Sequence, residues 1–114
     1  MTYKDLLVAL SGITPKQAYK KLEKNPNDQN KFIYEQIIIK DPKHAYWYAR
    51  NILKNKWKEA EEYIKNHPYW AYRYAKDVIN GRFLEAEPSI KKSPRDAYNY
   101  AYFIIDDDNF WKIN

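Results

Sequence analysis

A block of 26 residues recurs along this chain of 114 residues, and this repeat limits what the chain can fold into. Each clear copy begins with a proline, which is Pro42, Pro68 or Pro94. Three residues after the proline comes the pattern Ala-Tyr-x-Tyr-Ala, which starts at Ala45, Ala71 or Ala97. A diverged earlier copy starts at Pro15. Self-similarity at such a period is the signature of a repeat architecture in which neighbouring copies share one core.

Each copy is predicted to form two short helices. The proline suits the first helical position, because its missing N–H would have no partner there. In three of the four copies the preceding residue has a side-chain oxygen that can cap the helix: Thr14, Asp41 and Ser93. A matched column of residues that tolerate the left-handed backbone conformation predicts the end of the first helix: Asn55, Gly81 and Asp107.

The second helix is predicted from apolar residues at helical spacing. They are Trp57, Ala60 and Ile64 in one copy and Phe83, Ala86 and Ile90 in the next. The early copy has the counterparts Phe32, Glu35 and Ile39. Since Pro88 lies inside this helix in its copy, a late start or a kink is expected there.

The sequence therefore predicts an all-α single domain, residues 1–114, in which tandem helical hairpins stack as a short α-solenoid. The predicted parts are an N-terminal helix within 1–13 and repeats at about 14–40, 41–66, 67–92 and 93–114, the last one truncated. A compact helical bundle is the alternative, because so few repeats barely form a superhelix. Three or more stacked hairpins bury apolar faces that one hairpin leaves exposed.

The repeat carries a signature of Tyr-Ala, then Gly-Arg-Phe or its equivalent, then Glu-Ala-Glu. The matching segments are Tyr74-Ala75, Gly81-Arg82-Phe83 and Glu85-Ala86-Glu87-Pro88, with Trp57, Glu59, Ala60 and Glu61 in the preceding copy. It resembles short helical repeats in uncharacterised proteins of tailed phages and giant viruses. The resemblance implies a phage or viral origin, the cytoplasm of an infected cell and a role in meeting host proteins. It assigns no catalytic residues.

The composition argues against an enzyme and against a bound cofactor or metal ion. The chain has no Cys and only two Gly, so thiolate sites and a phosphate-binding glycine loop are excluded. The two histidines, His44 and His67, occupy different repeat positions and match no metal motif. Acidic residues recur near the start of the second helix. Their favourable interaction with the helix dipole, or ion pairs between helices, explains them without catalysis. No apolar run is long enough to cross a membrane, so a soluble cytoplasmic protein is expected.

Two columns on one edge of the first helices vary between copies and are rich in Trp and Arg, the types enriched at binding hot spots. We interpret these columns as a candidate partner-binding surface: His44, Trp47, Trp70, Arg73, Asp96 and Asn99. Packing of the tryptophans between repeats is the alternative interpretation. The repeated tyrosines hardly vary, which favours a core role for them: Tyr46, Tyr72 and Tyr98, and Tyr48, Tyr74 and Tyr100.

The leading functional prediction is a non-enzymatic module that binds a host or phage protein and inhibits or redirects it, including a defence factor. Nucleic-acid binding is an alternative, since 20 basic and 15 acidic residues give a net charge of +5 and the basic residues alternate with aromatics. Head-to-tail homo-oligomerisation is another, because residues 1–92 carry +7 and residues 93–114 carry −2. The acids Asp106, Asp107 and Asp108 form a predicted charged end.

Overall fold

The computed structural model describes residue 2 and residues 12–106, and in this part of the chain the fold is all-α, as predicted. The first helices of the four copies are α2 (Pro15–Lys24), α4 (Pro42–Tyr48), α6 (Pro68–Tyr74) and α8 (Pro94–Tyr100). The second helices are α3 (Lys31–Ile38), α5 (Lys58–Ile64) and α7 (Glu87–Ile90), the last one preceded by the 3₁₀ turn η3 (Leu84–Ala86). The predicted helix within residues 1–13 lies almost entirely outside the described residues.

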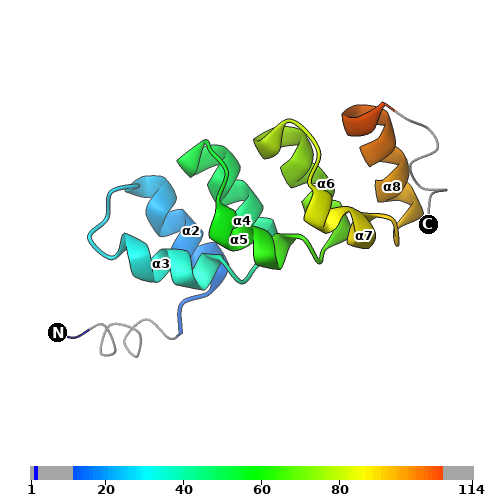
Figure 1. Cartoon of the computed structure of the whole chain (residues 1–114). Coiled ribbons are helices and arrows are strands. Elements are labelled where there is room, and N and C mark those ends of the chain that lie inside the picture. The colour runs from blue at the N-terminus through cyan, green and yellow to red at the C-terminus, as the bar shows by residue number, and fades with distance from the viewer. Residues whose placement is uncertain (1, 3–11, 107–114) are drawn as a thin grey trace.

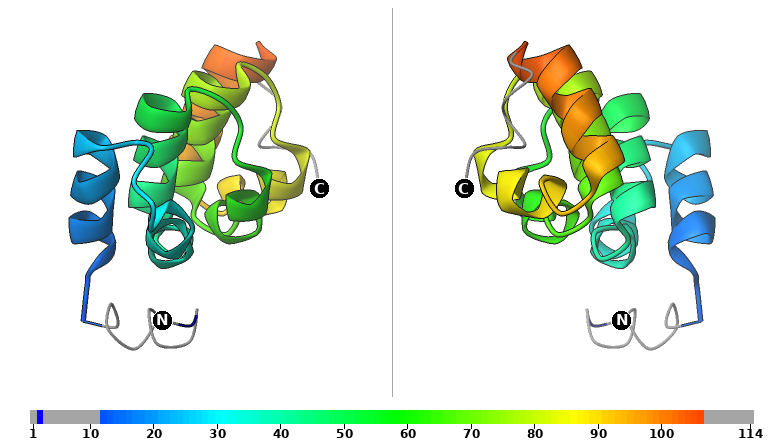
Figure 2. Two further views of the ribbon diagram at one scale, coloured as in Figure 1. Left: turned by 90° about the vertical axis from the view of Figure 1, so that its left-hand side faces the viewer. Right: turned by 90° about the vertical axis from the view of Figure 1, so that its right-hand side faces the viewer.

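The helices are arranged in two rows along an elongated molecule of 54 × 22 × 18 Å. Helices α2, α4, α6 and α8 stand side by side in one row, and α3, α5 and α7 form the second row (Figure 1). Seen along the stack, the successive first helices are shifted and tilted relative to one another, so they do not lie directly behind one another (Figure 2). Each first helix packs on the next one, which is the layout of a short α-solenoid.

The starts of the first helices follow the sequence signals. Thr14 and the N3 residue of α2, Gln17, form a reciprocal capping box. The side chains of Asp41 and Ser93 each accept a hydrogen bond from the backbone N–H three residues later. His67 makes no side-chain cap in α6. The three predicted caps are therefore confirmed.

The ends of three first helices differ from the prediction. From the second alanine of the motif each helix widens into a π-helical turn: η1 (Ala49–Leu53), η2 (Ala75–Ile79) and η4 (Ala101–Ile105). The left-handed residue that follows is Lys54, Asn80 or Asp106, at φ of 54°, 58° and 60°. The predicted column of Asn55 and Gly81 was therefore one residue too late, and Asp107 lies outside the described residues.

A hydrogen bond explains the one-residue difference. In the first π turn the N–H of Lys54 already bonds to the carbonyl of Ala49, so the chain reverses at that residue. The side chain of Asn55 has a different use, because its Oδ1 accepts a bond from the N–H of Lys56 at 2.8 Å. The sequence pattern indicated the right turn but not the extra width of the π segment.

The shared core is built from the columns that the repeat predicted. Ala45, Ala71, Ala97 and the predicted apolar residues of α5, η3 and α7 are all buried. The expected late start at Pro88 is confirmed, since α7 begins at Glu87 after the 3₁₀ turn. Of the apolar counterparts predicted in the early copy, Ile39 is buried, but Phe32 is 58% exposed, so the predicted register was wrong there. Tyr34 and Ile38 occupy the buried places instead.

The left-handed residues give a direct stability test. We expect Lys54→Gly to raise the free energy of unfolding by about 1 kcal/mol, because glycine adopts positive φ without steric cost. Gly81→Ala is the matched change one residue after Asn80. It should not destabilise the protein, because Gly81 has no positive φ and an added Cβ meets only Ile79 Cγ2 at 4.0 Å. Urea unfolding checks both, and a destabilised Gly81→Ala would contradict this assignment of the turn.

Candidate functional site

Three buried tyrosines tie each first helix to the second helix of the copy before it. The Tyr74 hydroxyl accepts a hydrogen bond from the Trp57 N–H at 2.8 Å and donates one to Glu61 Oε2 at 2.8 Å. Tyr100 repeats this arrangement with the Phe83 N–H and Glu87 Oε2, at 2.8 and 2.7 Å. The third member is Tyr48, whose hydroxyl donates to Glu35 Oε2 at 2.8 Å. All three side chains are fully buried, which confirms the predicted core role of this column.

The environment of these tyrosines keeps them protonated. Burial and the hydrogen bond to a carboxylate raise the pKa of Tyr48, Tyr74 and Tyr100 well above 10. Burial raises the pKa of Glu87, but hydrogen bonds from Arg82 and Tyr100 outweigh it and hold that pKa below its ordinary value. Neutral phenol and ionised carboxylate are thus the stable pairing of Tyr100 and Glu87. These groups are suited to structure and not to proton transfer at neutral pH.

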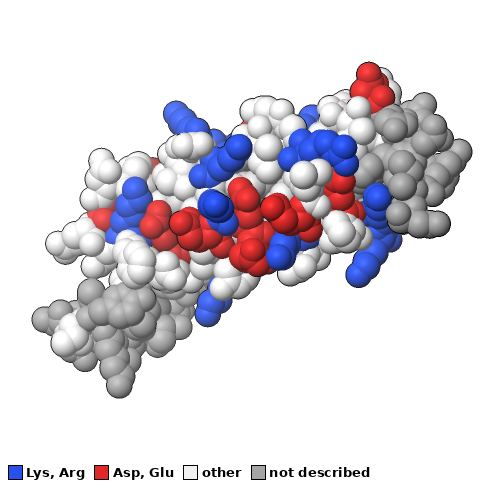
Figure 3. Space-filling model, viewed as in Figure 1, with Lys and Arg blue, Asp and Glu red and all other residues white. Residues whose placement is uncertain are grey.

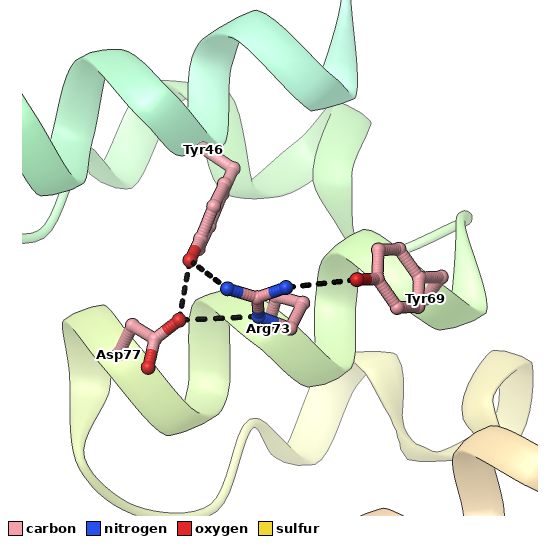
Figure 4. A network of polar contacts seen from close by, with 4 residues as sticks. All are labelled: Tyr46, Tyr69, Arg73 and Asp77. Atoms are coloured by element: carbon pink, nitrogen blue, oxygen red, sulfur yellow. Dashed lines mark hydrogen bonds and ion pairs between the residues drawn. The ribbon is translucent and has the colours of Figure 1, made fainter.

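A second polar network joins the copies through the first helices (Figure 4). The guanidinium of Arg73 on α6 bonds to Tyr69 Oη at 2.8 Å, to Tyr46 Oη at 3.2 Å and to Asp77 Oδ2 at 3.2 Å. The Tyr46 hydroxyl, on α4, also donates to Asp77. Burial and that hydrogen bond raise the pKa of Tyr46 to about 12. The guanidinium lies 5.4 Å from the centre of the Tyr46 ring as well.

The equivalent joint between α2 and α4 uses other residues. The rings of His44 and Trp47 both lie 6.1 Å from the Tyr19 ring, and Asn51 Nδ2 donates to Tyr19 Oη at 3.0 Å. His44 also contacts the carboxylate of Asp41 through Nδ1. Two of the six predicted partner-binding residues therefore face the preceding copy, with part of their surface covered.

The other four predicted residues continue along the same edge of the stack. Trp70 lies 5.5 Å from the Tyr46 ring, beside Arg73. Asp96 is only 2% exposed and pairs with Arg95, while Asn99 is half-buried. Contacts with the preceding copy are thus seen for His44, Trp47, Trp70 and Arg73. Asp96 and Asn99 occupy the equivalent repeat positions on α8. These contacts are the packing role that formed the alternative interpretation, and partner binding by these residues stays a prediction.

An exposed aromatic cluster at the C-terminal end of the described stack was not singled out from the sequence. Tyr98, Tyr102 and Phe103 are 60%, 59% and 54% exposed. The first two rings stack with centroids 6.3 Å apart at 15°, and Phe103 meets Tyr102 edge to face at 4.8 Å. The predicted core role was wrong for Tyr98, because its equivalents are buried by the next copy and no helix follows η4 among the described residues. The feature of the sequence that could have predicted the exposure of Tyr98 is its position in the last copy of the repeat.

The outer face of α2, at the other end of the stack, is basic. Gln17, Lys20, Lys21 and Lys24 are all exposed there. In the repeat register Gln17 corresponds to His44 and Trp70, and Lys20 corresponds to Trp47 and Arg73. The two ends of the described stack therefore carry different chemistry, with aromatic rings at one end and ammonium groups at the other.

The predicted charged end is seen only at its first member. Asp106 is exposed and left-handed, whereas Asp107 and Asp108 lie outside the described residues.

Within the described residues no group of three His, Cys, Asp or Glu side chains could hold a metal ion. None of the helices described is both long and apolar enough to cross a membrane. Acidic side chains form a band across one face, flanked by Lys and Arg (Figure 3).

The tyrosine column predicts a sharp difference between two conservative substitutions. We expect Tyr74→Phe to lower the free energy of unfolding by about 1–3 kcal/mol, because the buried Trp57 N–H and Glu61 lose their common partner. Tyr98→Phe is the control at an exposed ring and should change it by less than about 0.5 kcal/mol. Denaturant unfolding measures both. Equal effects would contradict the bridging role of the buried hydroxyl.

The raised pKa values of the buried tyrosines predict how stability depends on pH. Tyr46 and the column of Tyr48, Tyr74 and Tyr100 all have folded pKa values above the unfolded value of 10, and that of Tyr46 is about 12. The unfolded chain therefore releases these protons first, and stability present below pH 10 is lost as the pH rises towards 12. Chemical unfolding at successive pH values should show a constant contribution below pH 10 and a steep fall above it. An unchanged free energy up to pH 12 would contradict the raised pKa.

No protein-family model, curated protein or solved structure matches the chain.

Proposed function

We propose that this chain is a non-enzymatic helical-repeat module that binds another protein through the C-terminal end of its stack. The observation that carries the proposal is the exposed cluster of Tyr98, Tyr102 and Phe103. Large aromatic side chains that stay in solvent are typical of binding hot spots. Contiguous exposed apolar surface of this kind favours an interaction site over a plain surface.

The interior of the stack supports a binding role and not a catalytic one. Tyr48, Tyr74 and Tyr100 use their hydroxyls to join helices, and Arg73 is engaged by two tyrosines and an aspartate. No buried side-chain nitrogen or oxygen among the described residues lacks a hydrogen-bond partner. The polar groups that chemistry would need are thus committed to structure, and a rigid surface is what remains available.

The proposed mode of action is steric. A rigid stack occupies a site on a host factor and thereby inhibits or redirects it. The phage or viral origin in this proposal rests on the resemblance of the repeat signature at Tyr74-Ala75 and Gly81-Arg82-Phe83. A defence factor is one such host protein.

Nucleic-acid binding is the second candidate, and the exposed lysines of α2 favour it: Lys20, Lys21 and Lys24. The acidic band in Figure 3 weighs against a continuous cationic groove on that face. Binding by the lysines would be lost steeply as salt rises, because it depends on counterion release. The two candidates therefore differ in salt and nuclease sensitivity.

An affinity pull-down tests the proposal. The tagged chain is incubated with lysate of the cells in which the protein is made, with and without nuclease, and bound proteins are identified by mass spectrometry. We expect one stoichiometric protein that survives nuclease, and at least a tenfold lower recovery with the double variant Tyr98→Ser and Tyr102→Ser.

Tyr63→Ser provides the matched control, since Tyr63 is an exposed tyrosine on α5, away from this end. It should leave recovery unchanged. Loss of every partner on nuclease treatment would select nucleic-acid binding instead. Undiminished recovery with the double variant would show that a different surface binds.

A further inference from the structure

We propose that this aromatic end also binds a second copy of the chain, whose basic α2 face continues the stack head to tail. The inference rests on the proposed function of the same end. It names Tyr98 and Tyr102 as one half of the contact and Lys20 and Lys24 of the second copy as the other half. Copies within one chain already meet through contacts of this kind.

Within the chain, each joint places a tyrosine of one first helix against a fixed set of positions on the next. At the joint between α4 and α6, Tyr46 meets Trp70, Arg73 and Asp77. At the joint between α2 and α4, Tyr19 meets His44, Trp47 and Asn51. The same positions of the repeat are used both times, so the joint is a property of the repeat register.

The two ends of the described stack carry the two unmatched halves of this joint. Tyr98 is the repeat equivalent of Tyr46, and it is exposed where Tyr46 is buried. Lys20 is the equivalent of Arg73, and it is exposed on the outer face of α2. A second copy that continues the repeat register therefore brings the Lys20 ammonium onto the Tyr98 ring. Arg73 makes the corresponding cation–π contact with Tyr46, with its guanidinium 5.4 Å from the ring centre.

A second contact follows from the same register. At the joint between α6 and α8, the Lys76 ammonium lies 4.5 Å from the centre of the Phe103 ring. Tyr102 is the equivalent of Lys76, and Lys24 is the equivalent of Asp77 and Phe103. The intermolecular joint thus pairs a ring with an ammonium group again. The ring of Tyr102 now belongs to the preceding copy, and the ammonium group of Lys24 belongs to the copy that follows. Two cation–π contacts would therefore hold an intermolecular joint built on the intramolecular pattern.

Charge complementarity supports the same partner. Helix α2 contains four lysines and one acid, Glu23. The C-terminal segment 93–114 carries a net charge of −2, and exposed Asp106 follows the aromatic residues in the chain. Opposite charges at opposite ends favour a head-to-tail approach and disfavour contact between like ends.

The contact joins two different surfaces, so it does not close on itself in a pair. Such a heterologous contact generates an open series, which keeps one free aromatic end and one free basic end whatever its length. The joint uses the face of one helix on each side, and this small area predicts weak association. Association should weaken further with salt, because ammonium groups provide half of the contacts.

Two variants that each destroy one end provide the test. Lys20→Glu with Lys24→Glu removes the basic end, and Tyr98→Ser with Tyr102→Ser removes the aromatic end. Sedimentation velocity on the full chain, from about 10 μM to about 1 mM, measures the mass distribution. We expect the wild type to form a concentration-dependent series and each variant to remain monomeric.

The decisive sample is an equimolar mixture of the two variants. Each variant keeps the half that the other has lost, so the mixture should form dimers and nothing larger. A wild-type chain that stays monomeric over the whole range would overturn the inference. So would a mixture that stays monomeric while the wild type associates, because association would then use another surface.

Controls separate this inference from folding defects and from the proposed function. Lys40→Glu with Lys58→Glu makes the same charge change at exposed lysines outside α2 and should leave the series intact. Circular dichroism confirms that both end variants remain helical. A monomeric wild type that still captures a different protein through Tyr98 and Tyr102 would remove the self-association and leave the proposed function standing.

Discussion

The stack depends on one bridging interaction, the tyrosine hydroxyl that joins a backbone N–H to a glutamate carboxylate. Tyr74 and Tyr100 each make both bonds, and each reaches back to the second helix of the preceding copy. The second helices are short, and α7 has only four residues. Helices of this length are not stable alone in water. The bridge fixes the start of the second helix, where an N–H would otherwise be buried without a partner.

The bridge also explains why so polar a sequence builds a core. Tyr provides a large apolar ring together with a hydroxyl that can be satisfied inside the protein. Alanines at the repeated core positions let the helices approach closely, and the tyrosine rings fill the space between the rows. Of the carboxylates that the tyrosines contact, Glu35 and Glu61 are partly exposed at the edge of the core, whereas Glu87 is buried and pairs with Arg82. The abundance of Tyr and Glu is therefore a consequence of repeating one hairpin.

Much of this architecture could be predicted from the sequence, since caps and apolar columns act locally. Thr14, Asp41 and Ser93 lie where capping chemistry requires them, and the Tyr48 column is buried as expected. Contacts between copies could not be predicted in the same way. The partners Tyr46 and Asp77 are 31 residues apart, and their meeting depends on how neighbouring helices are rotated.

The candidate site was harder to predict for the same reason. Trp47 and Trp70 belong to types enriched in binding sites, but the stacking of the copies turns them towards the preceding helix. Tyr98 belongs to a buried column, but it is the last member of that column and remains exposed. Which residue of a repeat is free depends on its place in the series. The Ala-Tyr-x-Tyr-Ala motif and its spacing are the same in the inner copies and in the last one, so they do not carry that information.

The divergence of the joints has an evolutionary consequence. Arrays of repeats lose and gain copies when recombination aligns one copy with another. Loss of residues 67–92 would place α8 against α4, so Tyr46 would meet Asn99 and Phe103 in place of Arg73 and Asp77. Its buried hydroxyl would lose both the guanidinium and the carboxylate that now satisfy it. The copies are thus not interchangeable, because each joint is satisfied only by the neighbour it now has.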